Sequence, residues 1–228
     1  MPLSDQDRNE IVTRYSQRFA QHGYSPKTLG WDKGKQDVRF HILLSAFALR
    51  GKSVLDIGCG FGDMVPVLSK ATDGDFVYHG IDLVGNLVEV AVSTRESKNV
   101  TFEVADFLSD TVQGPYDIVI ASGIFNHKLT DMDNAEFVKR CLEKAFRLCT
   151  EGVAFDFLSD KTDYQYDHTY HSSPEEVLAA AYSLSRNVIL RNDYMPFEFS
   201  VFVFKDDSFD VEDTMFRRYK DGRAHLEG

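Results

Sequence analysis

The chain has 228 residues, and its 36 acidic and 25 basic side chains give a formal net charge of −11. So acidic a chain repels phosphate backbones, which argues against DNA or bulk RNA as its partner. Hydrophobic residues make up 43% and aromatic residues 13%, enough to bury a large core, and the length suits one domain. The longest apolar stretch, residues 40–49, is about half of the ~20 residues that a membrane-spanning helix needs.

The chain is expected in the reduced cytoplasm. Residues 1–5 have neither the basic segment nor the apolar core of a signal peptide. Three cysteines cannot all pair with one another, and we expect Cys141 and Cys149 to pack as small apolar side chains. No membrane partner is expected, and the sequence leaves the oligomeric state open.

The first fifty residues are predicted to be helical. Ser4 and Asp7 have the spacing of a helix-capping pair. Apolar residues then follow at intervals of four along one face: Ile11, Tyr15 and Phe19. After a turn region at 23–34, helical spacing returns over 38–49, and Gly51 ends the pattern.

From residue 53 to residue 204, β-rich and helical patterns alternate. Strands are predicted at 53–57, 76–81, 100–104, 117–121, 153–157, 187–191 and 197–204. Helices are predicted at 62–70, 86–97, 134–149 and 174–184. Such alternation is typical of βαβ units, while the last two strands, separated only by a loop, indicate an antiparallel hairpin at the edge of the sheet. The sequence therefore predicts an α/β fold with a seven-stranded, mostly parallel sheet whose last strand is antiparallel.

The strongest motif is an apolar strand that runs into a glycine-rich turn and then a helix, over residues 54–63. Glycines let a ligand approach the backbone closely, and the following helix offers free N–H groups. A dinucleotide motif, G-x-G-x-x-G, would need a third glycine where the chain has Asp63. The pattern is instead Asp-x-Gly-x-Gly-x-Gly, which begins at Asp56.

Two further acids stand at the ends of successive predicted strands. Asp82 follows the second strand, and a carboxylate there can accept hydrogen bonds from both hydroxyls of a ribose. Asp106 follows the third strand, where it can accept from an adenine amino group. Each acid taken singly can also be a solvated loop residue or a helix cap. Their occurrence at successive strand ends, together with the glycine turn, favours a nucleoside site.

These motifs, in this order, resemble the class I S-adenosylmethionine-dependent methyltransferases over about residues 50–160. The resemblance implies a three-layer, Rossmann-like sandwich that binds S-adenosyl-L-methionine at the carboxyl edge of its sheet. It also implies that Asp82 holds the ribose, that Leu83 packs on the adenine, and that Gly58 and Gly60 line the methionine part. The cofactor-binding residues that we expect are Asp56, Gly58, Cys59, Gly60, Asp82, Leu83, Asp106, Phe107 and Ser122.

The N-terminal helices are expected to cover the cofactor, because they carry Tyr15, Tyr24, Trp31 and Arg39. Arg39 is a candidate to pair bidentately with the cofactor's carboxylate, the alternative being a solvated arginine on a helix face. We therefore expect one domain, with a helical cap at 1–50 and a core at 51–204. The core includes a polar aromatic lid at 159–173, and the charged tail at 205–228 is expected to be mobile or to fold back weakly.

The fourth-strand motif bears on the acceptor. Amino-methylating nucleic-acid enzymes of this fold carry Asn/Asp-Pro-Pro-aromatic there, whereas this chain has Ser122-Gly123-Ile124-Phe125. The chain also has no Pro-Cys pair, which argues against methylation of cytosine C5 through a cysteine nucleophile. Small-molecule acceptors remain.

Methyl transfer from a sulfonium is an in-line displacement, so the enzyme has to align the acceptor and, in some reactions, to remove a proton. The candidate catalytic residues are Asn126 and His127, after the fourth strand, and His168. A purely structural role for His127 stays open.

The polar cluster around His168 allows more than one interpretation. Asp167, His168 and His171 have side chains that suit divalent metals, but they also suit a lid that recognises substrate, or simple packing. Since this segment need not be helical, the spacing of the two histidines does not imply that they converge. We expect no metal.

The sequence thus predicts a methyltransferase that uses S-adenosyl-L-methionine and acts on an oxygen or nitrogen of a small molecule. Two alternatives stay open because the fold alone does not decide between them. One is a non-catalytic scaffold or regulator that binds the cofactor. The other is a protein-modifying methyltransferase, whose lid would be open enough to admit a side chain.

Overall fold

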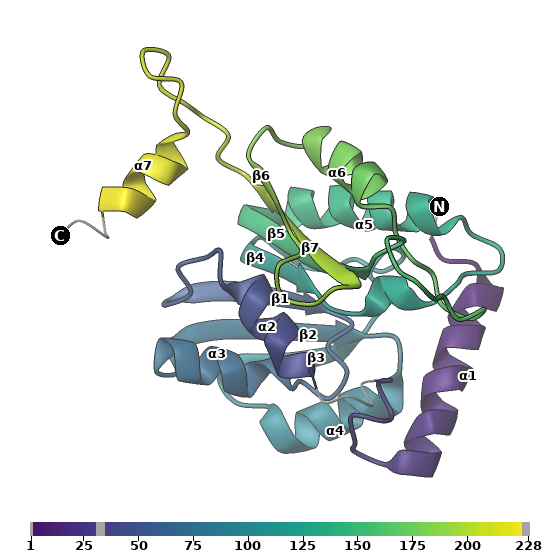
Figure 1. Cartoon of the computed structure of the whole chain (residues 1–228). Helices are drawn as coiled ribbons and strands as arrows, with labels where there is room; N and C mark the ends of the chain where they lie inside the picture. Colours follow the sequence, from purple (N-terminus) through teal and green to yellow (C-terminus); the bar gives the residue numbers. More distant parts are fainter. Residues whose placement is uncertain (1, 31–34, 225–228) are drawn as a thin grey trace.

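The computed structural model describes residues 2–30 and 35–224 (Figure 1). Its sheet has the strand order β3-β2-β1-β4-β5-β7-β6. The strands are β1 Lys52–Ile57, β2 Phe76–Asp82, β3 Val100–Val104, β4 Tyr116–Ala121, β5 Cys149–Leu158, β6 Val188–Arg191 and β7 Glu198–Phe204. The strands from β3 to β5 pair in parallel, and β7 lies antiparallel between β5 and β6. The predicted seven-stranded, mostly parallel sheet with an antiparallel last strand is confirmed.

Helices cover both faces of the sheet (Figure 1). One face carries α2 Gln36–Leu44 and α3 Met64–Thr72, and the other carries α5 Asn134–Leu148 and α6 Pro174–Tyr182. Because successive strand residues point to opposite faces, neighbours in β1 serve different cores. Val54 packs toward α2 and α3, whereas Leu55 packs toward α5 and α6. Helix α4, Gly85–Arg95, packs along β2 and β3.

Helix α1, Asp5–His22, contacts α4 and lies beside the layered core (Figure 1). Its predicted start is confirmed, because the Ser4 hydroxyl accepts a hydrogen bond from the Asp7 N–H at 3.0 Å. The Asp7 carboxylate is buried and accepts hydrogen bonds from backbone N–H groups of the loop at residues 130–132.

The second helix is shorter than its apolar pattern predicts, and the expectation that it runs to Gly51 is wrong. It ends at Leu44, and the Ser45 N–H and hydroxyl both donate to the Ile42 carbonyl, which closes a turn. The apolar residues beyond it still pack inward: the Phe47 ring lies 5.6 Å from that of Phe204. The helix-like spacing after Leu44 therefore reflects burial rather than helical backbone.

The segment after β7 folds back on the core. Helix α7, Arg217–Ala224, brings the Arg218 guanidinium to 3.5 Å from the centre of the Phe204 ring, and Arg218 also donates to the Ala46 carbonyl. Within the described residues, no helix has both the length and the apolar character needed to cross a membrane.

Candidate active site

The turn between β1 and α3 follows the predicted glycine motif. Gly58 has a φ of +73°, and a Cβ added there would lie 2.1 Å from a methyl carbon of Ile124. The N–H groups of Gly58 and Cys59 both donate to the Ile81 carbonyl, at 2.7 and 3.0 Å. The turn is thereby fixed against the end of β2, and glycine is needed both for the backbone conformation and for the close approach.

Asp82 ends β2 and faces this turn. One carboxylate oxygen accepts from the Gly60 N–H and the other from the Val84 N–H, each at 2.9 Å. Burial raises the pKa of Asp82, and the bonds from the Val84 and Gly60 amides oppose that rise. A carboxylate has about four acceptor positions. Since each oxygen receives one of these two bonds, each keeps a position for another donor.

Asp56, near the end of β1, is more deeply enclosed. Its side chain is 3% exposed and accepts a hydrogen bond from the Tyr78 hydroxyl at 2.6 Å. Burial raises the pKa of Asp56 to about 7, against the effect of the Tyr78 bond, and the nearby charges of Asp82 and Asp156 raise it further. This carboxyl group therefore changes its charge close to neutral pH.

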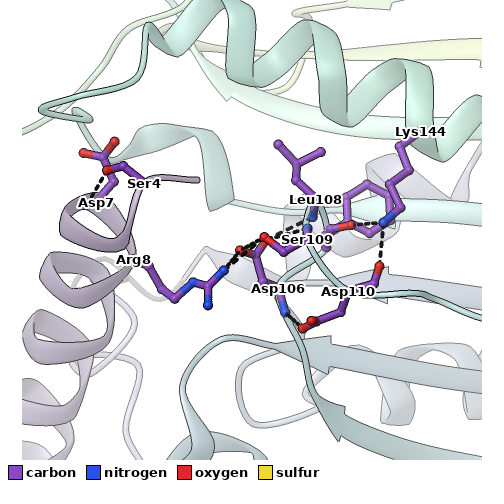
Figure 2. A network of polar contacts seen from close by, with 9 residues as sticks. Ser4, Asp7, Arg8, Asp106, Leu108, Ser109, Asp110 and Lys144 are labelled. Carbon is purple, nitrogen blue, oxygen red and sulfur yellow. Dashed lines mark hydrogen bonds and ion pairs between the residues drawn. The ribbon is translucent and has the colours of Figure 1, made fainter. Parts of the chain in front are cut away.

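Asp106, after β3, has the most hydrogen bonds of the three acids (Figure 2). One carboxylate oxygen accepts from the Arg8 guanidinium at 2.6 Å and from the Ser109 hydroxyl at 2.7 Å. The other accepts from the Leu108 N–H at 3.0 Å and, more weakly, from the Ser109 N–H at 3.4 Å. Its acceptor positions are therefore almost filled, and the long contact marks the position that is easiest to exchange.

These residues line one cavity at the carboxyl edge of the sheet. Of the expected cofactor-binding residues, the cavity is lined by Asp56, Gly58, Cys59, Gly60, Asp82, Leu83, Asp106, Phe107 and Ser122. The predicted cap contributes a wall, because Leu3, Ile11 and Tyr15 lie on the same cavity. Trp31, expected to cover the site, lies outside the described residues.

Arg39 differs from its expected role. It is buried and makes a bidentate ion pair with Glu198, which begins β7. It is not among the described residues that line the cavity. The expected pairing with the cofactor's carboxylate is therefore corrected: this guanidinium serves a carboxylate of the protein, 159 positions along the chain.

His127 is the candidate catalytic residue that reaches the cavity. It follows the short helix η1, Ile124–Asn126, at the end of β4. Its Nε2 is buried and has no hydrogen-bond partner in the described part of the chain. Burial lowers the pKa of His127, and the charge of Arg14 lowers it further, against the raising effects of Glu10 and Asp7. The imidazole is therefore held neutral near neutral pH, with one nitrogen free.

Asn126 and His168 do not reach the cavity, so a catalytic role for them stays a prediction. The Asn126 side-chain oxygen accepts a hydrogen bond from the Leu158 N–H at 3.2 Å, and the backbone carbonyl of Asn126 accepts one from the Tyr170 N–H. The His168 carbonyl accepts from the Lys128 N–H, and its ring lies against that of Tyr166. Neither is among the described residues that line the cavity. Both attach segment 159–173 to the loop that carries His127.

Ser122 is hydrogen-bonded to the buried carboxylate of Asp156. Its hydroxyl donates to one oxygen of Asp156 at 2.5 Å, while the Gly123 N–H donates to the other at 2.7 Å. Burial raises the pKa of Asp156 to about 6, and the charge of Arg39 opposes this rise. Because the Ser122 proton is committed to Asp156, this hydroxyl offers an acceptor to anything bound in the cavity.

Several lining residues were not predicted: Leu29, Gln36, Phe40, Val84, Leu87, Phe137 and Cys141. Apart from the polar Gln36, they are apolar residues and a cysteine from helices and loops, and such residues cannot be told from ordinary core residues in one sequence. Cys141, expected to serve packing, is buried and also borders the cavity. In the described part of the chain, no group of three histidine, cysteine or acidic side chains is placed to hold a metal ion.

Together the glycine turn, the carboxylates at the strand ends and the helix that closes the cavity define a site for a nucleoside cofactor on a Rossmann-like sheet. A family model described as a methyltransferase domain matches residues 49–200. The chain belongs to this methyltransferase family. It is an S-adenosylmethionine-dependent methyltransferase, with S-adenosyl-L-methionine as its methyl donor.

Solved structures share the fold. The magnesium protoporphyrin IX methyltransferase of Synechocystis with bound S-adenosylmethionine is 15% identical, with a TM-score of 0.63 over 90% of this chain and 99% of that one. Human N-acetylserotonin methyltransferase is 14% identical, with a TM-score of 0.64 over 88% of this chain and 59% of that one. A complex of DhpI with S-adenosylhomocysteine is 16% identical, with a TM-score of 0.64 over 87% of this chain and 97% of that one. No curated protein sequence matches the chain.

Proposed function

We propose that this enzyme methylates an oxygen or nitrogen of a small molecule and that His127 accepts the proton that the acceptor loses. The observation that carries the proposal is the imidazole itself: it lines the cavity with Nε2 buried and without a partner in the described part of the chain. A neutral imidazole with a free nitrogen is a suitable general base. When bound, the cofactor supplies a methyl group on a sulfonium, and the electron pair of the broken C–S bond stays on sulfur.

The residues at the glycine turn fit the cofactor. Asp82 has one acceptor position left on each oxygen, which matches the two hydroxyls of a ribose. Leu83 and Phe107 give apolar walls for the adenine, and Asp106 can accept from its amino group if the weak Ser109 N–H contact is displaced. These assignments make the cavity's acidic end the nucleoside end.

A small acceptor is supported by the way the cavity is closed. Helix α1 and the turn after β4 both contribute to its wall, and the lining is mostly apolar. Such a space suits a compact molecule with few polar groups. Two of the similar structures are methyltransferases named for magnesium protoporphyrin IX and N-acetylserotonin, both small molecules.

The proposal is tested by measuring formation of S-adenosylhomocysteine from the cofactor with fractions of a small-molecule extract. With an active fraction, His127→Ala should lower turnover by roughly 10²-fold while the affinity for S-adenosylhomocysteine stays unchanged. With saturating cofactor, wild-type activity should fall as the pH drops through the lowered pKa of His127, and the variant should lack this fall. His41→Ala, on the exposed side of α2, is the matched control.

The same measurements separate the alternatives. A His127→Ala enzyme as active as wild type would remove His127 as the base. Cofactor binding with no turnover on any fraction would favour a non-catalytic scaffold. Turnover on peptides, and not on small molecules, would favour a protein-modifying enzyme.

A further inference from the structure

The first turn of α1 is bound to the rest of the molecule on two sides, and Figure 2 shows the side on which Arg8 contacts Asp106. On one side, the Asp7 carboxylate accepts from the N–H groups of Thr130, Asp131 and Met132, at 2.6, 3.2 and 3.0 Å. On the other side, the Arg8 guanidinium reaches Asp106. The turn therefore bridges the loops that follow β3 and β4, across the carboxyl edge of the sheet.

The two ties differ in how well they are shielded from water. Asp7 is fully buried, whereas the Arg8 side chain is 36% exposed against 4% for Asp106. Ion pairs that water reaches are weaker and are screened by salt. The Arg8 tie is therefore the one expected to open first, while Asp7 stays in place as a pivot.

Arg8 is also suited to act on a ligand-binding carboxylate. One of its nitrogens donates to Asp106 at 2.6 Å and to the Ser109 hydroxyl at 3.0 Å, and Ser109 in turn donates to Asp106. Its Nε–H is buried and lacks an acceptor within the described residues. A buried donor without a partner is costly, so the guanidinium keeps one group that a bound molecule or a water can satisfy.

We propose that Arg8 is a positioning residue of the cofactor site: its ion pair with Asp106 holds α1 closed over the adenine end of the cavity and sets how long the cofactor stays bound. Ile11 and Tyr15 of the same helix line the cavity, so opening this tie moves one wall of the site. The inference rests on the proposed placement of the adenine beside Asp106 and needs no knowledge of the acceptor.

Dissociation rates test the inference, with S-adenosylhomocysteine and 5′-methylthioadenosine as probes. Arg8→Ala should release both probes roughly threefold to tenfold faster, because both contain the adenine and the lost contact is one ion pair that water reaches from the Arg8 side. Added salt should speed release from wild type and have little effect on the variant. Arg8→Lys, which keeps the charge, should restore part of the slow release.

Arg140→Ala is the matched control. Arg140 pairs with Glu136 at the same 2.6 Å, with its side chain 30% exposed, but on α5 and away from the cavity lining. This variant should release both probes at the wild-type rate. If circular dichroism shows that Arg8→Ala is unfolded, the inference is tested instead by the salt dependence of release from wild type and by the release rates of Arg8→Lys.

Four results would overturn the inference. The first three are release from Arg8→Ala within twofold of wild type, an unchanged salt dependence, and an effect on S-adenosylhomocysteine alone, which would place Arg8 at the methionine end. Slower release would make Arg8 a competitor of the adenine and would overturn it as well. None of these rates involves His127 or an acceptor. A result that overturns the role of Arg8 therefore leaves the proposed methyl transfer untouched.

Discussion

Asp82 offers the sharpest test of the cofactor site, through Asp82→Asn. The replacement has the same shape but no charge, and one of its two oxygens becomes an NH₂ group that cannot accept a hydrogen bond. In wild type each oxygen accepts one backbone N–H, from Gly60 or from Val84. The variant therefore leaves one of these amides without its acceptor, and it offers the ribose one acceptor in place of two.

The expected magnitude follows from these bonds. A hydrogen bond to a charged group contributes about 1.5–3 kcal/mol, and the variant loses one to the ribose and weakens the other. We expect a loss of about 3 kcal/mol in binding free energy, which is roughly a 150-fold increase in Kd. The unsatisfied backbone amide should lower the free energy of unfolding by about 1–3 kcal/mol, little enough for the variant to stay folded.

Calorimetric titration with S-adenosylhomocysteine measures the change in Kd, and thermal unfolding shows that the variant is folded. Wild type should lose affinity for a 2′-deoxy analogue, whereas Asp82→Asn should be far less sensitive to the missing hydroxyl. Asp75→Asn, at an exposed carboxylate paired with Arg50, is the control. A folded Asp82→Asn protein whose Kd stays within threefold of wild type would refute the reasoning.

Two further predictions concern the other buried acids. Because burial raises the pKa of Asp56 to about 7, the cationic cofactor should gain affinity relative to neutral S-adenosylhomocysteine from about pH 6 to about pH 8; a constant ratio in calorimetry would contradict this. Asp7→Ala should lower the free energy of unfolding in urea by about 2–4 kcal/mol, since three backbone N–H groups lose their acceptor. Burial raises the pKa of Asp7 but its hydrogen bonds outweigh this and lower it below 3.8, so the contribution should be present above about pH 4 and vanish as the pH falls through the folded pKa. A variant as stable as wild type at neutral pH would contradict this assignment.

The positions of the strands along the chain and the glycine turn are predictable from the sequence because their signals are local. An apolar strand, a turn that needs glycine and a following helix occupy consecutive residues. The same holds for β2, which ends at Asp82, and for β3, which Asp106 follows two residues after its end. Ser4 marks the start of α1 for the same reason. These features report the backbone of a segment directly, without information about its neighbours.

Long-range pairings gave no comparable signal. Arg39 pairs with Glu198 and Arg8 with Asp106, 159 and 98 positions away along the chain. Nothing in a single sequence says which carboxylate an arginine meets, so the sequence leaves Arg39 available to the cofactor's carboxylate. Asn126 shows the same limit: the sequence places it after β4, but it does not indicate that its side-chain oxygen accepts a hydrogen bond from the Leu158 N–H.

The acids at the strand ends illustrate the limit most clearly. In the sequence Asp56, Asp82 and Asp106 are equivalent, each an aspartate at the end of a β-strand. In the structure one accepts from a tyrosine hydroxyl, the next from two backbone amides, and the last from an arginine, a serine hydroxyl and two amides. Because a carboxylate has about four acceptor positions, these differences decide what each can still bind. Asp82 keeps acceptor positions for the two hydroxyls of a ribose. Those of Asp106 are almost filled by Arg8 of α1 and by residues of its own loop. Asp56 is buried, and its protonation responds to the charge of a bound cofactor.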